Sequence, residues 1–291
     1  MKNFILLNYN IKIDNIYYKN NEKYFFINED KIYIMECKDD NSYLEKIFRI
    51  TNDLYYQGIK VNTFIVNNKN KFFTNKDDKK IILIKENSMS EISLNYIKKF
   101  QNKNISLEDY DVLDEWIKEV DMLEKEITEY NKEYPLIKDY LDFFIGLAEN
   151  AIELLTNYKN IIKLNNNSIG HIINYKYFLN LNDPFSFIKT NEMYDVSNYI
   201  KYMIITNRVD YNNIDNVIKN NNEYQNAFLF SCLLYPTIFF EYIKNILLNN
   251  IKEDSLNIVI NRINRYLNIL SYCQNNIKNV KDIEIINWFN K

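Results

Sequence analysis

The residues best suited to acid–base chemistry lie close together in residues 168–207. This stretch contains His171, the only histidine in the sequence, and two aspartates, Asp183 and Asp195. A histidine acts as a general acid or base when a carboxylate or a nucleophile lies within hydrogen-bonding reach. The spacing reveals no such partner, so we expect a structural histidine that bonds to the backbone at a turn. Asp195 opens a helical pattern and suits its first turn, whereas Asp183-Pro184 is typical of a turn.

The glycine content excludes the common phosphate-binding loops. The chain has 3 glycines, Gly58, Gly146 and Gly170, and they are far apart. Walker loops, dinucleotide-binding turns and kinase glycine-rich loops need several glycines within a few residues, where the backbone approaches phosphate. The net charge of −3 provides no general attraction for nucleic acid. We therefore expect no glycine-rich nucleotide loop and no nucleic-acid partner.

The cysteines and the acidic residues form no recognisable metal motif. Cys37, Cys232 and Cys273 are widely spaced within apolar runs, which favours reduced, buried side chains. The segment Ser106–Glu129 carries carboxylates at helical spacing, opposite an apolar stripe. This pattern is typical of a solvated helix face. No metal site is predicted.

Short apolar runs between polar turns predict a β-rich region over residues 1–86. A helix interrupts it between residues 43 and 54, where apolar residues recur on one face and Gly58 is placed to end the helix. The predicted strands are Phe4–Leu7, Ile11–Tyr18, Tyr24–Ile27, Ile32–Cys37, Val61–Val66, Phe72-Phe73 and Ile81–Lys85.

From about residue 92 the apolar residues recur with the period of a helix. Pro135 suits the start of a helix, and Pro236 is expected to break or kink one. The predicted helices cover residues 112–127, 136–148, 196–205, 224–248 and 255–273.

Together these patterns predict an α+β protein with two lobes. The first, over residues 1–88, is β-rich with one main helix, and the second, over residues 89–291, is larger and helical. The apolar run at Ala227–Leu234 is too short to cross a membrane. The N-terminal residues are too short and too polar for a signal peptide, so we expect a soluble, cytoplasmic protein.

Two segments of the second lobe carry a resemblance to a known family. In Asp183–Ile204 (DPFSFIKTNEMYDVSNYIKYMI) a proline and an aromatic residue precede a strand, and Asp195 then opens a helix. Ala227–Leu247 has a Leu-aromatic-Pro run followed by Phe-Glu, and residues 285–288 resemble the end of the same family. The chain is thereby similar to the spore-coat-associated, kinase-like proteins of endospore-forming bacteria, a branch of the aminoglycoside-phosphotransferase-like and choline-kinase-like superfamily. The resemblance implies a two-lobed, protein-kinase-like fold.

The resemblance also implies where the catalytic groups of active members would stand. Those members use a His-Gly-Asp turn whose aspartate positions or deprotonates the acceptor hydroxyl, and an asparagine and a second aspartate that hold Mg²⁺. His171 matches the histidine, but Ile173, Phe178 and Thr190 stand at the three catalytic positions. In the superfamily, the aspartate comparable to Asp195 is structural and ties the catalytic loop to the helix. The resemblance therefore implies a degenerate member, a pseudokinase.

ATP is the one cofactor that this fold would still accommodate, and otherwise none is expected. Lys38 would contact the phosphates, with Glu45 as its partner on the helix. The alternative for Lys38 is a solvated lysine beside Asp39 and Asp40, since exposed ion pairs are common and weak.

Three functions follow from these observations. The first is an inactive kinase-like protein that acts as a binding or assembly factor, with protein partners such as spore-coat components. The second is a divergent ATP-dependent small-molecule phosphotransferase that uses Lys38 and either Asp183 or Asp195. The third is a helical interaction module without kinase ancestry, which a sheet of five strands beside one helix would argue against.

Overall fold

The chain divides into two compact units. The computed structural model describes residues 1–19, 22–87, 92–103, 105–130, 134–175 and 179–280. The first unit comprises Met1–Ile92 together with Leu181–Phe187, and the second comprises Ser93–Asn180 and Ile188–Lys291. The boundary predicted from the sequence is residue 88, and residues 181–187 were predicted to belong to the helical lobe.

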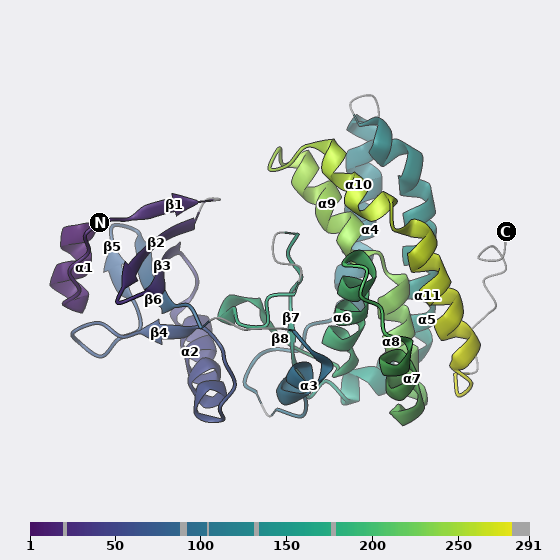
Figure 1. Ribbon diagram of the computed structural model, residues 1–291, viewed down its shortest axis with the longest axis horizontal. Coiled ribbons are helices and arrows are strands. Elements are labelled where there is room, and N and C mark those ends of the chain that lie inside the picture. Colours follow the sequence, from purple (N-terminus) through teal and green to yellow (C-terminus); the bar gives the residue numbers. More distant parts are fainter. Residues whose placement is uncertain (20–21, 88–91, 104, 131–133, 176–178, 281–291) are drawn as a thin grey trace. The chain divides into compact units, whose positions relative to one another are not determined.

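An antiparallel sheet forms the body of the first unit (Figure 1). The strands follow the order β1-β2-β3-β6-β4, and β5 also pairs with β6. Asn28 and Glu29, both with positive φ, form the tight turn between β2 and β3. Within the described residues the six strands are β1 (Tyr17–Lys19), β2 (Glu22–Ile27), β3 (Asp30–Cys37), β4 (Thr63–Ile65), β5 (Thr74–Lys76) and β6 (Lys79–Lys85).

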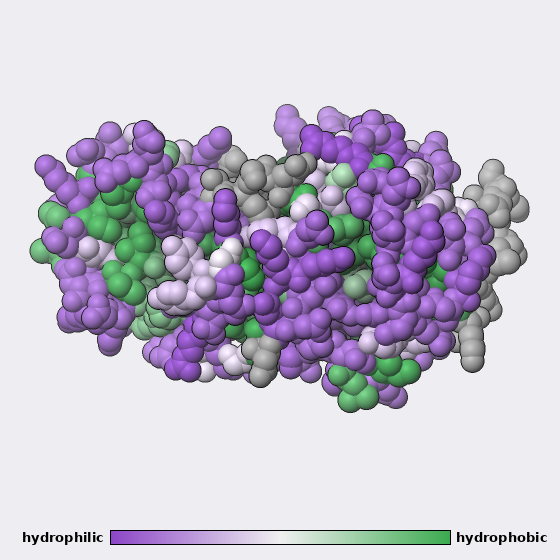
Figure 2. Space-filling view, turned by 60° about the horizontal axis from the view of Figure 1, so that its bottom comes forward, coloured by the Kyte–Doolittle hydropathy of each residue, from purple (hydrophilic) through white to green (hydrophobic). Residues whose placement is uncertain are grey.

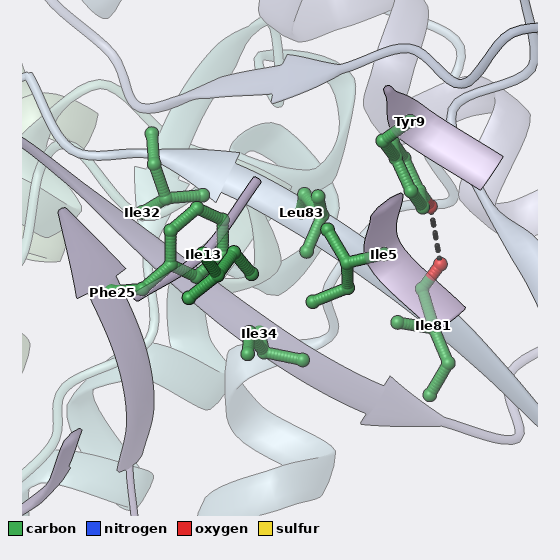
Figure 3. Close-up of a cluster of buried hydrophobic side chains, with 8 residues drawn as sticks. All are labelled: Ile5, Tyr9, Ile13, Phe25, Ile32, Ile34, Ile81 and Leu83. Carbon is green, nitrogen blue, oxygen red and sulfur yellow. Dashed lines mark hydrogen bonds between the residues drawn. The ribbon is translucent and has the colours of Figure 1, made fainter. Parts of the chain in front are cut away.

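One face of this sheet is covered by helix α1 (Lys2–Tyr9), as Figure 3 shows. Ile5 and Tyr9 lie one helical turn apart, and both are buried in a cluster with Phe25, Ile32 and other sheet residues. The Tyr9 hydroxyl donates to the Ile81 carbonyl over 3.0 Å. The predicted strand at Phe4–Leu7 is therefore wrong: these residues are helical, with Phe4 and Ile5 packed on the cluster and Leu6 and Leu7 exposed.

Helix α2 (Asn41–Tyr56) packs on the opposite face. The Asp40 carboxylate accepts from the Ser42 N–H at its start, and Gly58 follows its end with a φ of 76°. The Phe48 ring stacks on Phe72 and meets the edge of Phe64 on β4. The predicted helix and its glycine terminus are confirmed.

The other predicted strands are confirmed in part. Tyr24–Ile27, Ile32–Cys37 and Ile81–Lys85 correspond to β2, β3 and β6. Of the predicted strand Ile11–Tyr18, only the last two residues are in a strand, β1. Phe72-Phe73 precedes β5 and is not part of it. The Phe72 side chain is instead buried against α2, where its apolar surface is removed from water.

The second unit is helical apart from a short strand pair. Pro135 is the first residue of α5, as predicted, because its missing N–H would have no partner there. Pro236 separates α8 from α9, also as predicted, and the last predicted helix is divided in two. Its helices are α3 (Leu94–Ile97), α4 (Val112–Tyr130), α5 (Pro135–Leu164), α6 (Met193–Ile205), α7 (Tyr211–Asn220), α8 (Glu223–Leu234), α9 (Thr237–Leu247), α10 (Asn257–Ile260) and α11 (Ile263–Asn276), with short 3₁₀ turns η1 (Lys98–Phe100) and η3 (Glu253–Leu256).

The most apolar stretch of the chain is a core element of this unit. Glu223–Leu247 passes a length-and-composition test for a membrane span, but 83% of its apolar window is buried inside the protein. On the face shown in Figure 2, hydrophobic side chains gather in separate patches among polar ones. Helix α8 is buried on all sides from Asn226 to Leu234, as expected for the central helix of a globular unit.

Candidate functional site

His171 and Asp195, two of the three residues that the sequence singled out for acid–base chemistry, lie in the second unit. Strand β7 (Ser168–His171) pairs with β8 (Phe187–Thr190), and every residue of β7 is buried. A Cβ atom at Gly170 would lie 2.4 Å from the Thr190 Cγ2, so only glycine allows this close approach without a shift. The pairing places the end of β7 beside the first turn of α6.

His171 and Asp195 meet at this point through two hydrogen bonds. The His171 backbone N–H donates to Asp195 Oδ1 over 2.9 Å, and the imidazole Nδ1 lies 2.6 Å from Oδ2. Asp195 is in the first turn of α6, where the helix dipole also favours its negative charge. The carboxylate therefore ties the end of β7 to the helix.

The imidazole is enclosed by protein. His171 is 0% exposed and Asp195 3% exposed, and the Phe100 ring packs edge-on at 4.8 Å between ring centroids. The expectation that His171 bonds to the backbone is wrong for Nδ1, whose partner is the Asp195 side chain. The residue is also not in a turn, because it is the last residue of strand β7. A general acid or base must reach its substrate, which this closed position does not allow.

The positions that the resemblance assigned to catalysis carry no carboxylate where the structure describes them. Ile173 is 4% exposed and Thr190 is 0% exposed. The Thr190 hydroxyl oxygen makes no hydrogen bond within the described residues, and its methyl group is the atom closest to Gly170. Phe178 lies outside the described residues, as do residues 285–288. Within the described ranges, no three His, Cys, Asp or Glu side chains come together as a metal-binding group.

Asp183 belongs to the first unit and caps a turn. Its carboxylate accepts from the Phe185 N–H over 3.0 Å at the start of the 3₁₀ turn η2 (Pro184–Ser186), which confirms the predicted turn. In the same segment Asn182 donates to the Asn87 carbonyl. The two aspartates considered for a divergent phosphotransferase thus have separate structural roles.

Lys38 and Glu45 are both exposed in the first unit. Lys38 directly follows β3 and takes part in no ion pair that the described residues form. Glu45, on α2, lies 3.9 Å from Arg49 one turn later on the same helix. The two side chains do not form the lysine–glutamate pair of protein kinases, and a role for them in ATP binding stays a prediction.

Strand β3 does contain a lysine that sequence analysis did not single out. Protein kinases carry the phosphate-binding lysine on the third strand and pair it with a helix glutamate. Lys31 is the only lysine within β3, and its acidic partner is Glu86 at 3.7 Å, after the end of β6. Its ammonium also lies over the rings of Tyr24 and Tyr33, 4.8 and 4.3 Å from their centroids.

Two charged side chains in the second unit, one buried and one partly buried, were also missed. Lys201 on α6 is 3% exposed, and burial lowers its pKa to about 8. Glu119 on α4 is 17% exposed, although its segment was predicted as a solvated face. It accepts from the Tyr235 hydroxyl over 2.6 Å and pairs with Lys244 over 2.7 Å. Helical spacing puts Glu119 three residues after Trp116 and four before Leu123, at the edge of the apolar stripe, and Tyr235 and, on α9, Lys244 contact its carboxylate there.

Several solved structures resemble the chain. An aminoglycoside phosphotransferase from Alicyclobacillus acidocaldarius matches with a TM-score of 0.69 at 10% identity, over 96% of each chain. The spectinomycin phosphotransferase APH(9)-Ia, in complex with ADP and spectinomycin, matches with a TM-score of 0.57 at 11% identity, over 86% of this chain and 88% of that one. The chain has the aminoglycoside-phosphotransferase-like kinase fold. No family model matches the sequence, and no curated protein matches it significantly.

This kinase-like fold agrees with the predicted fold class. The β-rich region with one main helix and the helical remainder are both present, and the third hypothesis, a helical module without kinase ancestry, loses its support. At such low identity the similarity establishes the fold alone.

Proposed function

We propose that this kinase-like protein is catalytically inactive and acts by binding other proteins. The observation that carries the proposal is the state of the β7–β8–α6 region. Asp195 is committed to His171, Glu192 before α6 accepts from the Gln225 side chain, and the neighbouring positions are Ile173 and Thr190. Phosphoryl transfer depends on carboxylates that hold Mg²⁺ and orient the nucleophile.

The first unit offers side chains suited to protein contacts. Tyr17, Tyr18 and Phe26 are 44%, 70% and 51% exposed on β1 and β2, and β1 is an edge strand. Aromatic side chains are enriched in protein interfaces, and an open strand edge can pair with another chain. The family resemblance of Asp183–Ile204 and Ala227–Leu247 makes assembly of a bacterial spore coat the proposed setting.

Thermal unfolding tests the loss of catalysis directly. The chain is heated with ATP, with Mg²⁺, and with both, and ADP release is measured in parallel. A ligand at a hundred times its Kd stabilises the folded state by about 2.7 kcal/mol, a readily measured shift. We expect no Mg²⁺-dependent stabilisation and no turnover. Mg²⁺-dependent ATP hydrolysis that persists through purification, and that is lost in Asp183→Asn, would refute the proposal.

The setting has its own test. A fluorescently tagged chain, expressed in an endospore-forming bacterium, should concentrate at the spore coat during sporulation. A variant with Tyr17, Tyr18 and Phe26 all changed to serine should fold but lose this location. A diffuse wild-type signal throughout sporulation would exclude the coat as its place of action.

The fold itself supports one alternative, a divergent small-molecule phosphotransferase. The similar proteins include phosphotransferases, one of them solved with ADP and spectinomycin. This alternative needs acidic groups from elsewhere, since both Asp195 oxygens accept hydrogen bonds from His171. Turnover in the assay above would favour it.

A further inference from the structure

Helix α1 of the first unit exposes part of its apolar surface to solvent. Ile5 and Tyr9 point into the cluster on the sheet (Figure 3). Leu6 and Leu7, which lie between them in the sequence, are 44% and 77% exposed. Single exposed leucines are common on protein surfaces, so this pair is informative only together with the residues around it.

The loop between β4 and β5 lies beside the end of this helix. The Asn68 backbone N–H donates to the Asn8 carbonyl over 2.8 Å. The Asn68 side-chain amide donates to the Leu7 carbonyl over 3.0 Å. These bonds use carbonyl groups from the last turn of α1, which have no partner within the helix. Side chains of the loop and of α1 therefore belong to one continuous surface.

The loop adds an exposed aliphatic residue and two exposed lysines to this surface. Val66 is 42% exposed, and Lys69 and Lys71 are also exposed. The side-chain oxygen of the buried Asn67 accepts from the backbone N–H groups of both lysines, over 2.9 and 3.0 Å. The loop thus has a defined conformation in which both lysines are kept close to the end of α1.

Lysine dominates the charge of the two segments that meet here. Residues 1–16 and 66–80 contain seven lysines and three aspartates, a net charge of +4, in a chain whose net charge is −3. Two of these aspartates are in the turn between β5 and β6. The third, Asp14, lies beside Lys2, whose ammonium donates to the Asp14 carbonyl. An acidic protein therefore has a locally basic surface next to its exposed leucines.

We propose that this α1 surface docks on an anionic lipid membrane. Leu6 and Leu7 would enter the boundary between headgroups and acyl chains, and the lysines would contact the negative headgroups. The α1 surface consists of Lys2, Leu6, Leu7, Val66, Lys69 and Lys71.

An acidic protein would offer the same charge as an anionic membrane. None of the six residues is aromatic or an arginine, the types that are enriched in protein interfaces. Exposed aliphatic side chains bordered by lysines instead fit a lipid surface, which accepts apolar groups without a shaped pocket. The contact is peripheral, and the proposal is independent of the proposed function.

Co-sedimentation of the full chain with vesicles tests the proposal. The probe is a phosphatidylcholine vesicle with about 30% phosphatidylserine, and phosphatidylcholine alone is the neutral control. We expect binding to the anionic vesicle only. Raising the salt concentration from about 0.1 M to about 1 M shortens the Debye length from about 10 Å to about 3 Å, and should weaken binding at least about fivefold.

Two paired variants separate the charge from the apolar contact. Lys69→Gln with Lys71→Gln should weaken binding about 25-fold, since each lysine contributes about fivefold, the equivalent of about 1 kcal/mol. Leu6→Ser with Leu7→Ser should weaken binding at least about tenfold, because both variants lose apolar surface that the membrane removes from water. If this pair fails to fold, Leu7→Ser alone, at the more exposed position, replaces it.

Matched controls remove the same residue types elsewhere. Lys159→Gln with Lys163→Gln removes two exposed lysines of α5 and should leave affinity unchanged. Leu164→Ser with Leu248→Ser removes leucines that are 87% and 70% exposed, and should also have no effect. Circular dichroism verifies that each variant is folded.

Three outcomes overturn the proposal. The first is a folded wild type that binds neither vesicle, which is the result expected of a surface for an acidic protein. The second is equal binding to both vesicles. The third is wild-type affinity in either the lysine or the leucine variant of the α1 surface.

Discussion

Two regions of the molecule carry residues capable of kinase-like chemistry, and the protein treats them in opposite ways. In the second unit His171 and Asp195 are buried, joined by two hydrogen bonds, and packed under Phe100. In the first unit Lys38 and Glu45 are exposed, and the partner of Glu45 is Arg49 on its own helix. The first pair is assembled but closed to substrate, whereas the second is open but not assembled. Residue type therefore indicates where chemistry is conceivable, and burial and pairing decide whether it is available.

The largest expected difference between the two regions is the effect of removing Asp195. Asp195→Ala leaves a buried backbone N–H and an imidazole nitrogen of His171 without their acceptor, which should destabilise the fold by about 3 kcal/mol. Urea unfolding followed by circular dichroism measures this change. Asp121→Ala on the exposed side of α4 is the control and should stay within about 0.5 kcal/mol. Equal effects of the two variants would show that the buried pair is not structural.

A second prediction concerns the strand contact that positions this pair. Gly170→Ala places a Cβ atom 2.4 Å from Thr190 Cγ2, and the resulting shift should cost about 1–3 kcal/mol. Gly146→Ala, within α5, meets no atom within 4 Å and should stabilise the fold by about 0.5–1 kcal/mol, since alanine is the better helix former. Thermal unfolding of the two variants should therefore give shifts of opposite sign. A neutral Gly170→Ala would mean that β7 and β8 separate at little cost.

Sequence alone predicted much of the fold, because periodicity and terminators act locally. Pro135 at the start of α5, Pro236 between α8 and α9, and Gly58 after α2 are all where the pattern placed them. The run at Phe4–Leu7 was assigned to the wrong element. Four consecutive apolar residues are compatible with either a strand or a short helix, and contact with a distant sheet decided between them.

The candidate site was less predictable. The pairing of His171 with Asp195 joins residues 24 positions apart, and nothing in their spacing requires it. The partners of Glu119, Tyr235 just before α9 and Lys244 on α9, lie more than 100 residues later in the chain. Lys201 carried one usable signal. It stands in an apolar run, after Ile200 and before Tyr202, Met203 and Ile204, so a buried lysine was conceivable there.

A third prediction uses pH to distinguish buried from exposed lysines. Burial lowers the pKa of Lys201 to about 8 in the folded state, below its ordinary value of 10.5. Between these values the unfolded chain binds more protons, so folding stability gains from this group as pH rises above 8. Relative to Lys201→Met, the wild type should therefore gain about 1 kcal/mol between pH 7 and pH 9. Urea midpoints at both values measure the difference. A parallel pH dependence in the two proteins would show that Lys201 titrates as an exposed lysine does.

The smallest changes in stability are expected for the exposed residues Lys38 and Glu45 of the first unit. Lys38→Ala and Glu45→Ala should each change the free energy of unfolding by less than about 0.5 kcal/mol, because both side chains are solvated and their contacts are weak. A double-mutant cycle should give a coupling energy near zero, as expected for groups that do not touch. Repeating the cycle with ATP and Mg²⁺ sharpens the comparison. If the nucleotide joined Lys38 and Glu45 in one site, coupling would appear only in its presence, and the open region would be a nucleotide site that the ligand assembles. Coupling that stays near zero in both conditions leaves these residues as ordinary surface charges.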